Sequence, residues 1–215
     1  SGSEKLYTPY QGVGARAVAS LSSKLLMALF PPNTPFFRLV IDQYKLDEIT
    51  GDPEIRTEVE TTLNRIEQAV MAEIESQNYR PFIHEALKQL IVAGNVLVHM
   101  PDEGGMKVFK MDRYVVKSDP SGEAQIIILK ESIAPAMLPD SLLERAQQET
   151  ARVEDTVDVY TCIHRISADE YEVWQEAFGE PIEQTKGTYP AKELPWIPLR
   201  MEVVTGESYG YGYAT

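Results

Sequence analysis

YRPFIHEALKQLIVAGNVLVHM, the stretch from Tyr79 to Met100, predicts a helix that runs directly into a strand. Apolar side chains recur at three- and four-residue steps through its first half, which places one broad apolar face on a helix. These side chains are Phe82, Ile83, Ala86, Leu87, Leu90 and Ile91. Gly94 then supplies the left-handed residue that closes such a helix, and Val96 to Val98 form an apolar run of strand length. A segment this apolar is expected at the core, with the rest of the chain packed on it.

Two longer helices are predicted upstream of this stretch. The first runs from Gln11 to Phe30, and Pro31-Pro32 ends it because neither proline can donate the next helical hydrogen bond. The second begins at Asp52-Pro53, where the carboxylate accepts unpaired N–H groups and proline takes the first helical position, and it runs to about Ser76. The expected core stripes are Val18, Leu21, Leu25, Leu26, Leu29 and Phe30 on the first helix, and Val59, Leu63, Ile66, Val70 and Ile74 on the second.

Strands are predicted in the remaining segments, most of them in the second half of the chain. Phe36 to Ile41 reads as a short buried strand between the two helices, followed by a polar connection or helical turn from Asp42 to Ile49. After Met100 the apolar period changes to two. The strands expected there are Met106 to Met111, Tyr114 to Lys117, Ala124 to Lys130, Thr156 to Ile166, Tyr171 to Phe178 and Pro195 to Val204. Ser118 to Gly122 has the residue chemistry of a hairpin turn, and Pro139 to Thr150 predicts an exposed helix.

The predicted fold class is therefore α+β, with amino-terminal helices packed on a mostly antiparallel sheet built from hairpins. Residues 1–3 (Ser-Gly-Ser) resemble a cloning remnant and stand outside the fold. Residues 4–94 form a mainly helical part, and residues 95–205 form a β-rich part. The tail from residue 206 to 215, GESYGYGYAT, is expected to be the truncated start of a further region of the protein.

Composition excludes several classes of protein. A net charge of −13 without any basic run argues against a surface that grips nucleic acid statically, because phosphate binding needs clustered lysine and arginine; a well-solvated surface is the plainer interpretation. Cys162 is the single cysteine, so neither a disulfide framework nor a thiolate metal site is expected, and a reducing compartment is favoured. No apolar stretch is long enough for a membrane span, and no signal peptide opens the chain.

Two glycine motifs resemble catalytic or cofactor sites but lack the context that those sites need. Gly12 to Ala17 fits the pattern of dinucleotide-binding turns, yet no strand leads into it and no βαβ alternation follows, so close helix packing against small residues is the better account. Gly206 to Gly210 matches a nucleophile elbow, but a hydrolase needs an acid and a histidine further along the chain, and no histidine follows.

The remaining candidate residues do not form a catalytic set. His84, His99 and His164 have no metal-ligand spacing, and His84 beside the apolar helix face is expected to be a hydrogen-bonded structural residue. Tyr209, Tyr211 and Tyr213 alternate with glycines and either form an interface patch or pack against a continuation of the chain. We therefore expect no catalytic residue, cofactor or metal, and the sequence does not identify DNA-binding residues.

Three blocks of the sequence resemble the portal, or head-to-tail connector, proteins of short-tailed T7-like bacteriophages. The first is Tyr10 to Leu39, with its VGAR start and ALFP end, and the second is Tyr79 to Pro101, continued by a segment ending in YVV. The third combines DVYTCIH, GTYP, IPLRM and GESYG, from Asp158 to Gly210. These blocks occur in the family's order and cover most of the chain, whereas the region from Arg145 to Asp155 matches poorly.

The resemblance implies a structural subunit and not an enzyme. Family members form dodecameric rings at one capsid vertex, through which terminase drives double-stranded DNA inward and through which DNA later leaves. The ring also docks the capsid, the tail and the internal core proteins. The resemblance thus implies localisation in the virion, and in the host cytoplasm during assembly, with no membrane. It places residues 4–205 in the wing and makes residues 206–215 a truncated lead into a missing stem region.

Two other interpretations stay open from the sequence. One is a non-enzymatic α+β module that binds a protein partner through its sheet edges or its tyrosine-rich tail. The other is a small enzyme that uses the turn at Gly12 to bind a nucleotide. The reading frame after Thr215 distinguishes the binding module from a portal, because stem helices would follow in a portal. A nucleotide-dependent thermal shift tests the enzyme interpretation.

Overall fold

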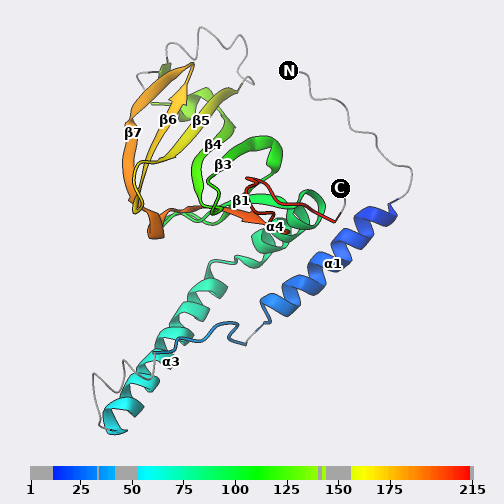
Figure 1. Ribbon diagram of the computed structural model, residues 1–215, viewed down its shortest axis with the longest axis vertical. Helices are drawn as coiled ribbons and strands as arrows, with labels where there is room; N and C mark the ends of the chain where they lie inside the picture. The colour runs from blue at the N-terminus through cyan, green and yellow to red at the C-terminus, as the bar shows by residue number, and fades with distance from the viewer. Residues whose placement is uncertain (1–11, 33, 42–52, 140–141, 144–155, 214–215) are drawn as a thin grey trace. The chain divides into compact units, whose positions relative to one another are not determined.

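The structure, a computed structural model, describes residues 12–32, 34–41, 53–139, 142–143 and 156–213 (Figure 1). The chain divides into two compact units, residues 1–88 and 89–215, and the division falls within a helix. The first unit is helical and the second is built mainly of antiparallel strands. The predicted α+β fold class is confirmed. Within the described ranges, no helix combines the length and the apolar character needed to cross a membrane.

The helices of the first unit begin and end close to where proline and glycine predict. Helix α1 spans Val13–Leu29 with Gly12 at its N-cap, and it ends at Phe30, whose N–H donates to the carbonyl of Leu26 at 2.8 Å. Helix α3 spans Pro53–Ser76, so proline does occupy the first helical position. The expected capping residue Asp52 lies outside the described residues.

The predicted core stripe of α3 is only partly covered, with Val59, Leu63 and Ile74 half-buried. Ile66 and Val70 remain 44% and 39% exposed, and among the described residues of α1 and α3 only Ser22 and Glu67 are buried. Periodicity identifies which side of a helix is apolar, but burial needs a second element to cover that side. On α1, Leu21 and Leu29 are likewise exposed.

The strand predicted from Phe36 to Ile41 is also absent. This segment does not form a strand and lies along α3, where the N–H of Leu39 donates to Oε1 of Glu67 at 2.5 Å. A strand needs a neighbouring strand to satisfy its backbone groups, and here a carboxylate supplies the acceptor instead. The polar connection predicted from Asp42 to Ile49 lies outside the described residues.

The helix-to-strand switch predicted from Tyr79 to Met100 is confirmed. Helix α4 spans Arg80–Ala93, Gly94 follows with a φ of 71°, and strand β1 covers Asn95–His99. Strand β1 is the middle strand of a three-stranded antiparallel sheet between β2 (Lys107–Phe109) and β8 (Trp196–Arg200). Pro198 is tolerated because β8 is an edge strand of this sheet.

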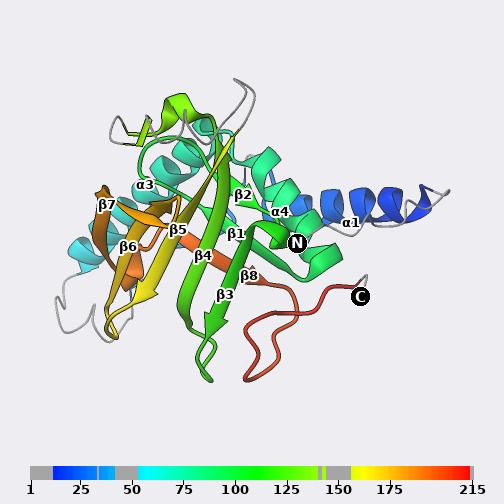
Figure 2. The ribbon, with the colours of Figure 1, turned by 90° about the horizontal axis from the view of Figure 1, so that it is seen from above.

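The larger sheet is an antiparallel meander of five strands in the order β3-β4-β5-β6-β7 (Figure 2). The strands are β3 (Tyr114–Ser118), β4 (Ala124–Ile133), β5 (Val157–Arg165), β6 (Glu170–Ala177) and β7 (Glu180–Pro190). Short 3₁₀ turns occupy Met111–Arg113, Pro135–Met137 and Ala191–Glu193. The helix predicted from Pro139 to Thr150 lies largely outside the described residues.

Strand β7 was not predicted from the sequence. Its sequence, EPIEQTKGTYP, has no apolar alternation, and Ile182 is its one buried residue. Such a polar strand exists because hydrogen bonds to β6 hold it, from Glu170 opposite Pro190 to Ala177 opposite Glu180. The two strands are adjacent in the chain, because Phe178 and Gly179, both with positive φ, form the two-residue turn that joins β6 to β7.

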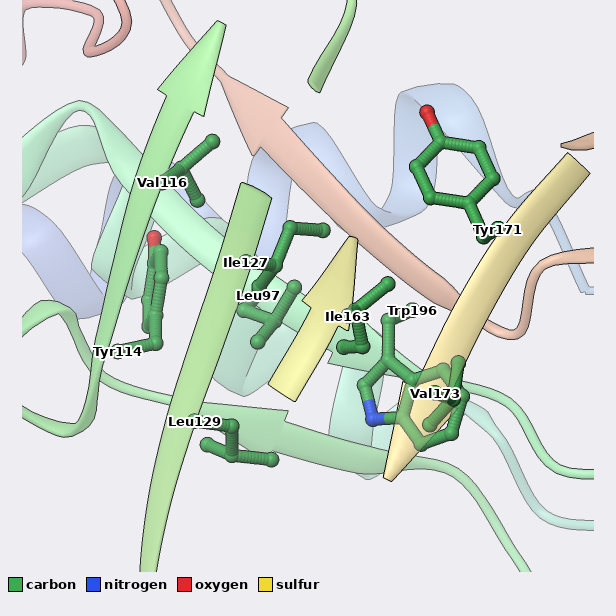
Figure 3. Packing of buried hydrophobic residues seen from close by; sticks show 9 residues of the cluster. All are labelled: Leu97, Tyr114, Val116, Ile127, Leu129, Ile163, Tyr171, Val173 and Trp196. Atoms are coloured by element: carbon green, nitrogen blue, oxygen red, sulfur yellow. The ribbon is translucent and has the colours of Figure 1, made fainter. Parts of the chain in front are cut away.

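The core of the second unit lies between the two sheets (Figure 3). The smaller sheet contributes Leu97 and Trp196, and alternate residues of β3, β4, β5 and β6 face them. The cluster consists of Leu97, Tyr114, Val116, Ile127, Leu129, Ile163, Tyr171, Val173 and Trp196. A smaller cluster of Leu138, Val157, Val159, Ala177 and Ile182 closes another part of the large sheet. The expectation that Val96 to Val98 lie in the core is confirmed.

Candidate functional site

The tail folds back onto the turn that joins α4 to β1. We call residues 206–213 the C-terminal strap. Within it, the N–H of Gly210 donates to Oδ1 of Asn95 at 2.7 Å, and Nδ2 of Asn95 donates to the carbonyl of Gly210 at 2.7 Å. Asn95 is only 2% exposed, and its amide both accepts from and donates to the backbone of Gly210, as a residue of a neighbouring strand would. The N–H of Tyr213 adds a bond to the carbonyl of Ile91 at 2.9 Å.

Three glycines allow the strap to approach this closely. A Cβ atom at Gly94 would lie 2.3 Å from the carbonyl carbon of Tyr211, and one at Gly212 would lie 2.5 Å from the carbonyl oxygen of Val92. At Gly210 it would lie 2.7 Å from the carbonyl oxygen of Glu202. All of these neighbours are backbone atoms, which cannot turn aside as a flexible side chain can. Glycine at these positions is a condition of the contact.

Two strap side chains bond to the edge of the large sheet. The hydroxyl oxygen of Tyr209 accepts a bond from the N–H of Val116 at 2.9 Å, and Oγ of Ser208 accepts one from the N–H of Ser118 at 2.9 Å. Both N–H groups belong to β3, whose one neighbouring strand is β4. The hydroxyls therefore occupy the side of β3 on which a further strand would pair.

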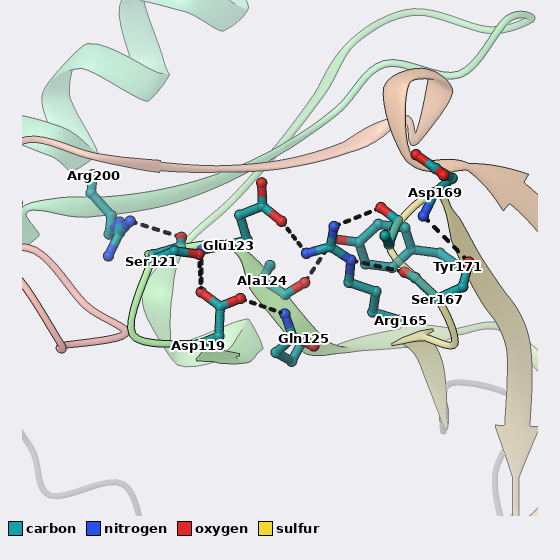
Figure 4. Close-up of polar contacts among 12 residues, drawn as sticks. Asp119, Ser121, Glu123, Ala124, Gln125, Arg165, Ser167, Asp169, Tyr171 and Arg200 are labelled. Carbon is teal, nitrogen blue, oxygen red and sulfur yellow. Dashed lines mark hydrogen bonds and ion pairs between the residues drawn. The ribbon is translucent and has the colours of Figure 1, made fainter.

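Arg200 joins the strap to the hairpin between β3 and β4 (Figure 4). Its Nη1 donates to the carbonyl of Glu207 at 2.8 Å, and its Nη2 donates to the carbonyl of Gly122 at 3.0 Å. The hairpin turn is stiffened by Asp119, whose carboxylate accepts bonds from the Ser121 hydroxyl, the Glu123 N–H and the Gln125 amide. The hydroxyl bond from Ser121 is the main reason that the pKa of Asp119 lies below its ordinary value.

Arg165 organises the adjoining end of the large sheet (Figure 4). It forms an ion pair with Glu123, and its guanidinium donates to the carbonyls of Ser167 at 3.0 Å and Ala168 at 2.6 Å. These three partners of Arg165 all lie within the second unit. The described residues contain no cluster of three or more histidine, cysteine, aspartate or glutamate side chains arranged to hold a metal. The bonds of Arg165 tie the β5–β6 turn to the hairpin between β3 and β4.

His99 is held neutral beside the core. Its ring stacks on Trp196 with centroids 4.5 Å apart and planes within 6° of parallel. Burial, helped by the positive charge of Lys107, lowers the pKa of His99 to about 4. Its stacking on Trp196 indicates that His99 contributes to the packing of the smaller sheet.

Acid should therefore weaken the second unit through His99. The unfolded chain binds the proton near a pKa of 6.5 and the folded chain only near about 4, so stability is fully present above pH 6.5 and falls as the pH drops from 6.5 to about 4. We expect a loss of about 1 kcal/mol in this window, reduced because the ring is partly solvated. Denaturant titrations at pH 7 and pH 5 measure it. His99→Phe keeps the stacking without titrating and is the control; an equal pH dependence in this variant would contradict the assignment.

The remaining histidines and the glycines of the first motif lie apart from one another and form no common site. His84 has the expected hydrogen bond, with Nε2 at 2.9 Å from Oγ of Ser22, while His164 lies on β5. Close helix packing was the expected reason for Gly12 and Gly14, and this is wrong, because no described atom lies within 4 Å of a Cβ built at either.

The two remaining candidates, the nucleophile-elbow motif around Ser208 and the alternating tyrosines, both lie in the C-terminal strap. Ser208 is a hydrogen-bond acceptor for β3 and not an exposed nucleophile. Tyr209 packs on its own unit, whereas Tyr211 and Tyr213 are exposed. The roles of Asn95 and Arg200 were not predicted from the sequence. Asn95 directly follows Gly94 in the chain, and no local pattern indicates a partner 115 residues away.

A model of the family described as bacteriophage head to tail connecting protein matches residues 1–215. The chain belongs to this family. The portal protein of Escherichia phage T7 is 38% identical over 214 residues, which cover 96% of this chain and 40% of that protein. The portal protein of Enterobacteria phage T3 is 37% identical over the same shares, and that of Enterobacteria phage SP6 is 31% identical over 94% of this chain and 40% of its own length. The chain thus spans about 40% of the length of these curated relatives, and the predicted resemblance is confirmed.

Proposed function

We propose that this chain is part of a structural subunit of a viral portal, the ring that connects the head of a bacteriophage to its tail. The observation that carries the proposal is the family match over residues 1–215, together with relatives that are named portal proteins. The subunit is not an enzyme. It assembles with capsid and tail, and it belongs to the virion at the capsid vertex after assembly in the host cytoplasm.

In this proposal the complete protein forms a dodecameric ring, and double-stranded DNA passes through its channel during packaging and ejection. The ring docks terminase, tail and internal core proteins. Residues 4–94 are the mainly helical part of the wing, residues 95–205 are its β-rich part, and residues 206–215 lead toward the stem. The net charge of −13 is compatible with DNA that slides without tight phosphate contacts. A basic channel wall in the assembled ring would contradict this last step.

Ring closure requires two different complementary surfaces on every subunit, because its contacts are head-to-tail. Exposed apolar side chains on the helices of the first unit suit such contacts. They are Val13, Met27 and Leu29 on α1 and Ile55, Ile66 and Val70 on α3. Scattered apolar residues need no partner, but several on neighbouring turns of one helix favour a protein contact.

Negative-stain electron microscopy of the full-length protein, with the 215-residue chain beside it, tests the proposal. We expect rings with a central hole from the full-length protein. A chain that stays monomeric beside such rings places the assembly contacts in the other part of the protein. A full-length protein that stays monomeric at all concentrations and salts would overturn the portal proposal and favour a protein-binding module, for which the exposed Tyr211 and Tyr213 are the candidate contact.

A further inference from the structure

The two edges of the five-stranded sheet are protected in different ways. An edge strand presents unpaired N–H and C=O groups on which another chain can build, and proteins block such edges with proline, charge or cover. Strand β7 carries Pro181, Lys186 and Pro190 in its own sequence. Strand β3 is YVVKS, which is rich in β-formers, has no proline and carries one charge. Its protection comes from another segment of the chain.

That segment is the C-terminal strap, and its cover of β3 consists of hydroxyl groups. Tyr209 and Ser208 accept the bonds from Val116 and Ser118 that a neighbouring strand would otherwise accept. The strap's backbone is bonded elsewhere, with Gly210 on Asn95 and Tyr211 on Glu202. These two hydroxyl bonds satisfy the N–H groups of Val116 and Ser118 but do not form the continuous ladder of a paired strand. A strand from another chain could therefore replace them at the edge of β3.

We propose that the strap caps β3 against a second copy of this chain, and that displacing these hydroxyls lets two copies pair through their β3 strands. Because the N–H of Val116 points outward, a two-fold axis beside it makes Val116 of both copies a hydrogen-bonded antiparallel pair. This register sets Val115 opposite Lys117 of the second copy, so no like charges face each other. The pairing extends the sheet at its β3 edge, and the side chain of Val115, which is 55% exposed, lies on the face away from the core.

The cap matters because two-fold pairing competes with ring closure. Two β3 edges that pair form a closed, isologous dimer, whereas a ring needs head-to-tail contacts that leave both surfaces free to continue. This consequence rests on the proposed portal function. The edge pairing itself does not, and its test reads the mass of the 215-residue chain alone.

The test compares the 215-residue chain with the variant S208A/Y209F by sedimentation velocity over a range of concentrations. The variant removes both hydroxyl acceptors and keeps the aromatic ring. We expect it to dimerise at a concentration about tenfold or more below that of the unchanged chain, since two hydrogen bonds no longer compete with pairing. A variant that is folded by circular dichroism and stays as monomeric as the unchanged chain would overturn the proposal. If the double variant unfolds, S208A and Y209F are tested singly by the same criterion.

Charge substitutions test the register. In the S208A/Y209F background, V115K places a lysine opposite Lys117 of the second copy on both sides of the two-fold axis, and we expect dimerisation to weaken about tenfold. Adding K117E converts both contacts to opposite charges and should restore the dimer. Dimerisation that ignores V115K, or that K117E does not restore, would show that β3 is not the contact. The matched control is V115T, which changes the same exposed position without adding charge.

Discussion

Replacement of Leu97 with alanine is expected to lower the free energy of unfolding of the second unit by about 4 kcal/mol. Leu97 is 0% exposed and contributes, with Trp196, the smaller sheet's share of the cluster between the two sheets (Figure 3). Truncation removes the transfer free energy of the side chain and leaves a cavity. Because rigid strands line that cavity on both sides, the surrounding residues cannot collapse into it, which places the cost in the upper half of the usual range. Urea titration followed by tryptophan fluorescence measures the change.

Val115→Ala is the matched control for this experiment. It also removes apolar carbon from a strand of the second unit, but Val115 points to the exposed side of β3. We expect a loss below about 1 kcal/mol, since a surface substitution leaves no cavity. Equal losses for the two variants would contradict the placement of the core between the sheets.

Gly94→Ala is expected to destabilise the second unit by about 3 kcal/mol and to release the C-terminal strap. Two costs add at this position. The φ of 71° is strained for any residue with a Cβ, and the new Cβ would lie 2.3 Å from the carbonyl carbon of Tyr211 and 2.4 Å from the N of Gly212. The chain relieves the clash by letting the strap move away, at the cost of the bonds to Asn95. Amide exchange at Gly210 and Tyr213 should then accelerate together with the loss of stability.

Gly179→Ala separates the two costs. Gly179 has a φ of 76°, close to that of Gly94, yet no described atom lies within 4 Å of a Cβ built there. This variant therefore carries the backbone strain alone, and we expect a loss of about 1 kcal/mol with the exchange at Gly210 unchanged. If Gly94→Ala costs no more than Gly179→Ala, the close approach of the strap does not contribute to stability.

The hydrogen bonds of the candidate site could not be predicted from the sequence. Tyr209 and Ser208 attracted notice through an alternation with glycine and a hydrolase-like motif, but their partners on β3 lie 93 and 90 residues away. Arg200 likewise reaches Gly122 across 78 residues. A single long-range hydrogen bond leaves no periodic pattern and no local bias in composition, so it cannot be predicted from the sequence alone.

The sequence by itself determined the elements whose causes are local. Apolar spacing and Gly94 specify the switch from α4 to β1, proline specifies the start of α3, and alternation specifies the hairpins of β3 to β6. Tertiary structure alone decided the rest. Whether an apolar helix face is buried depends on the element that covers it, which is why Ile66 stays exposed. Whether FFRLVI becomes a strand depends on a partner edge. Local patterns fix the conformation of a segment, whereas burial and pairing are free energies of contact with distant ones.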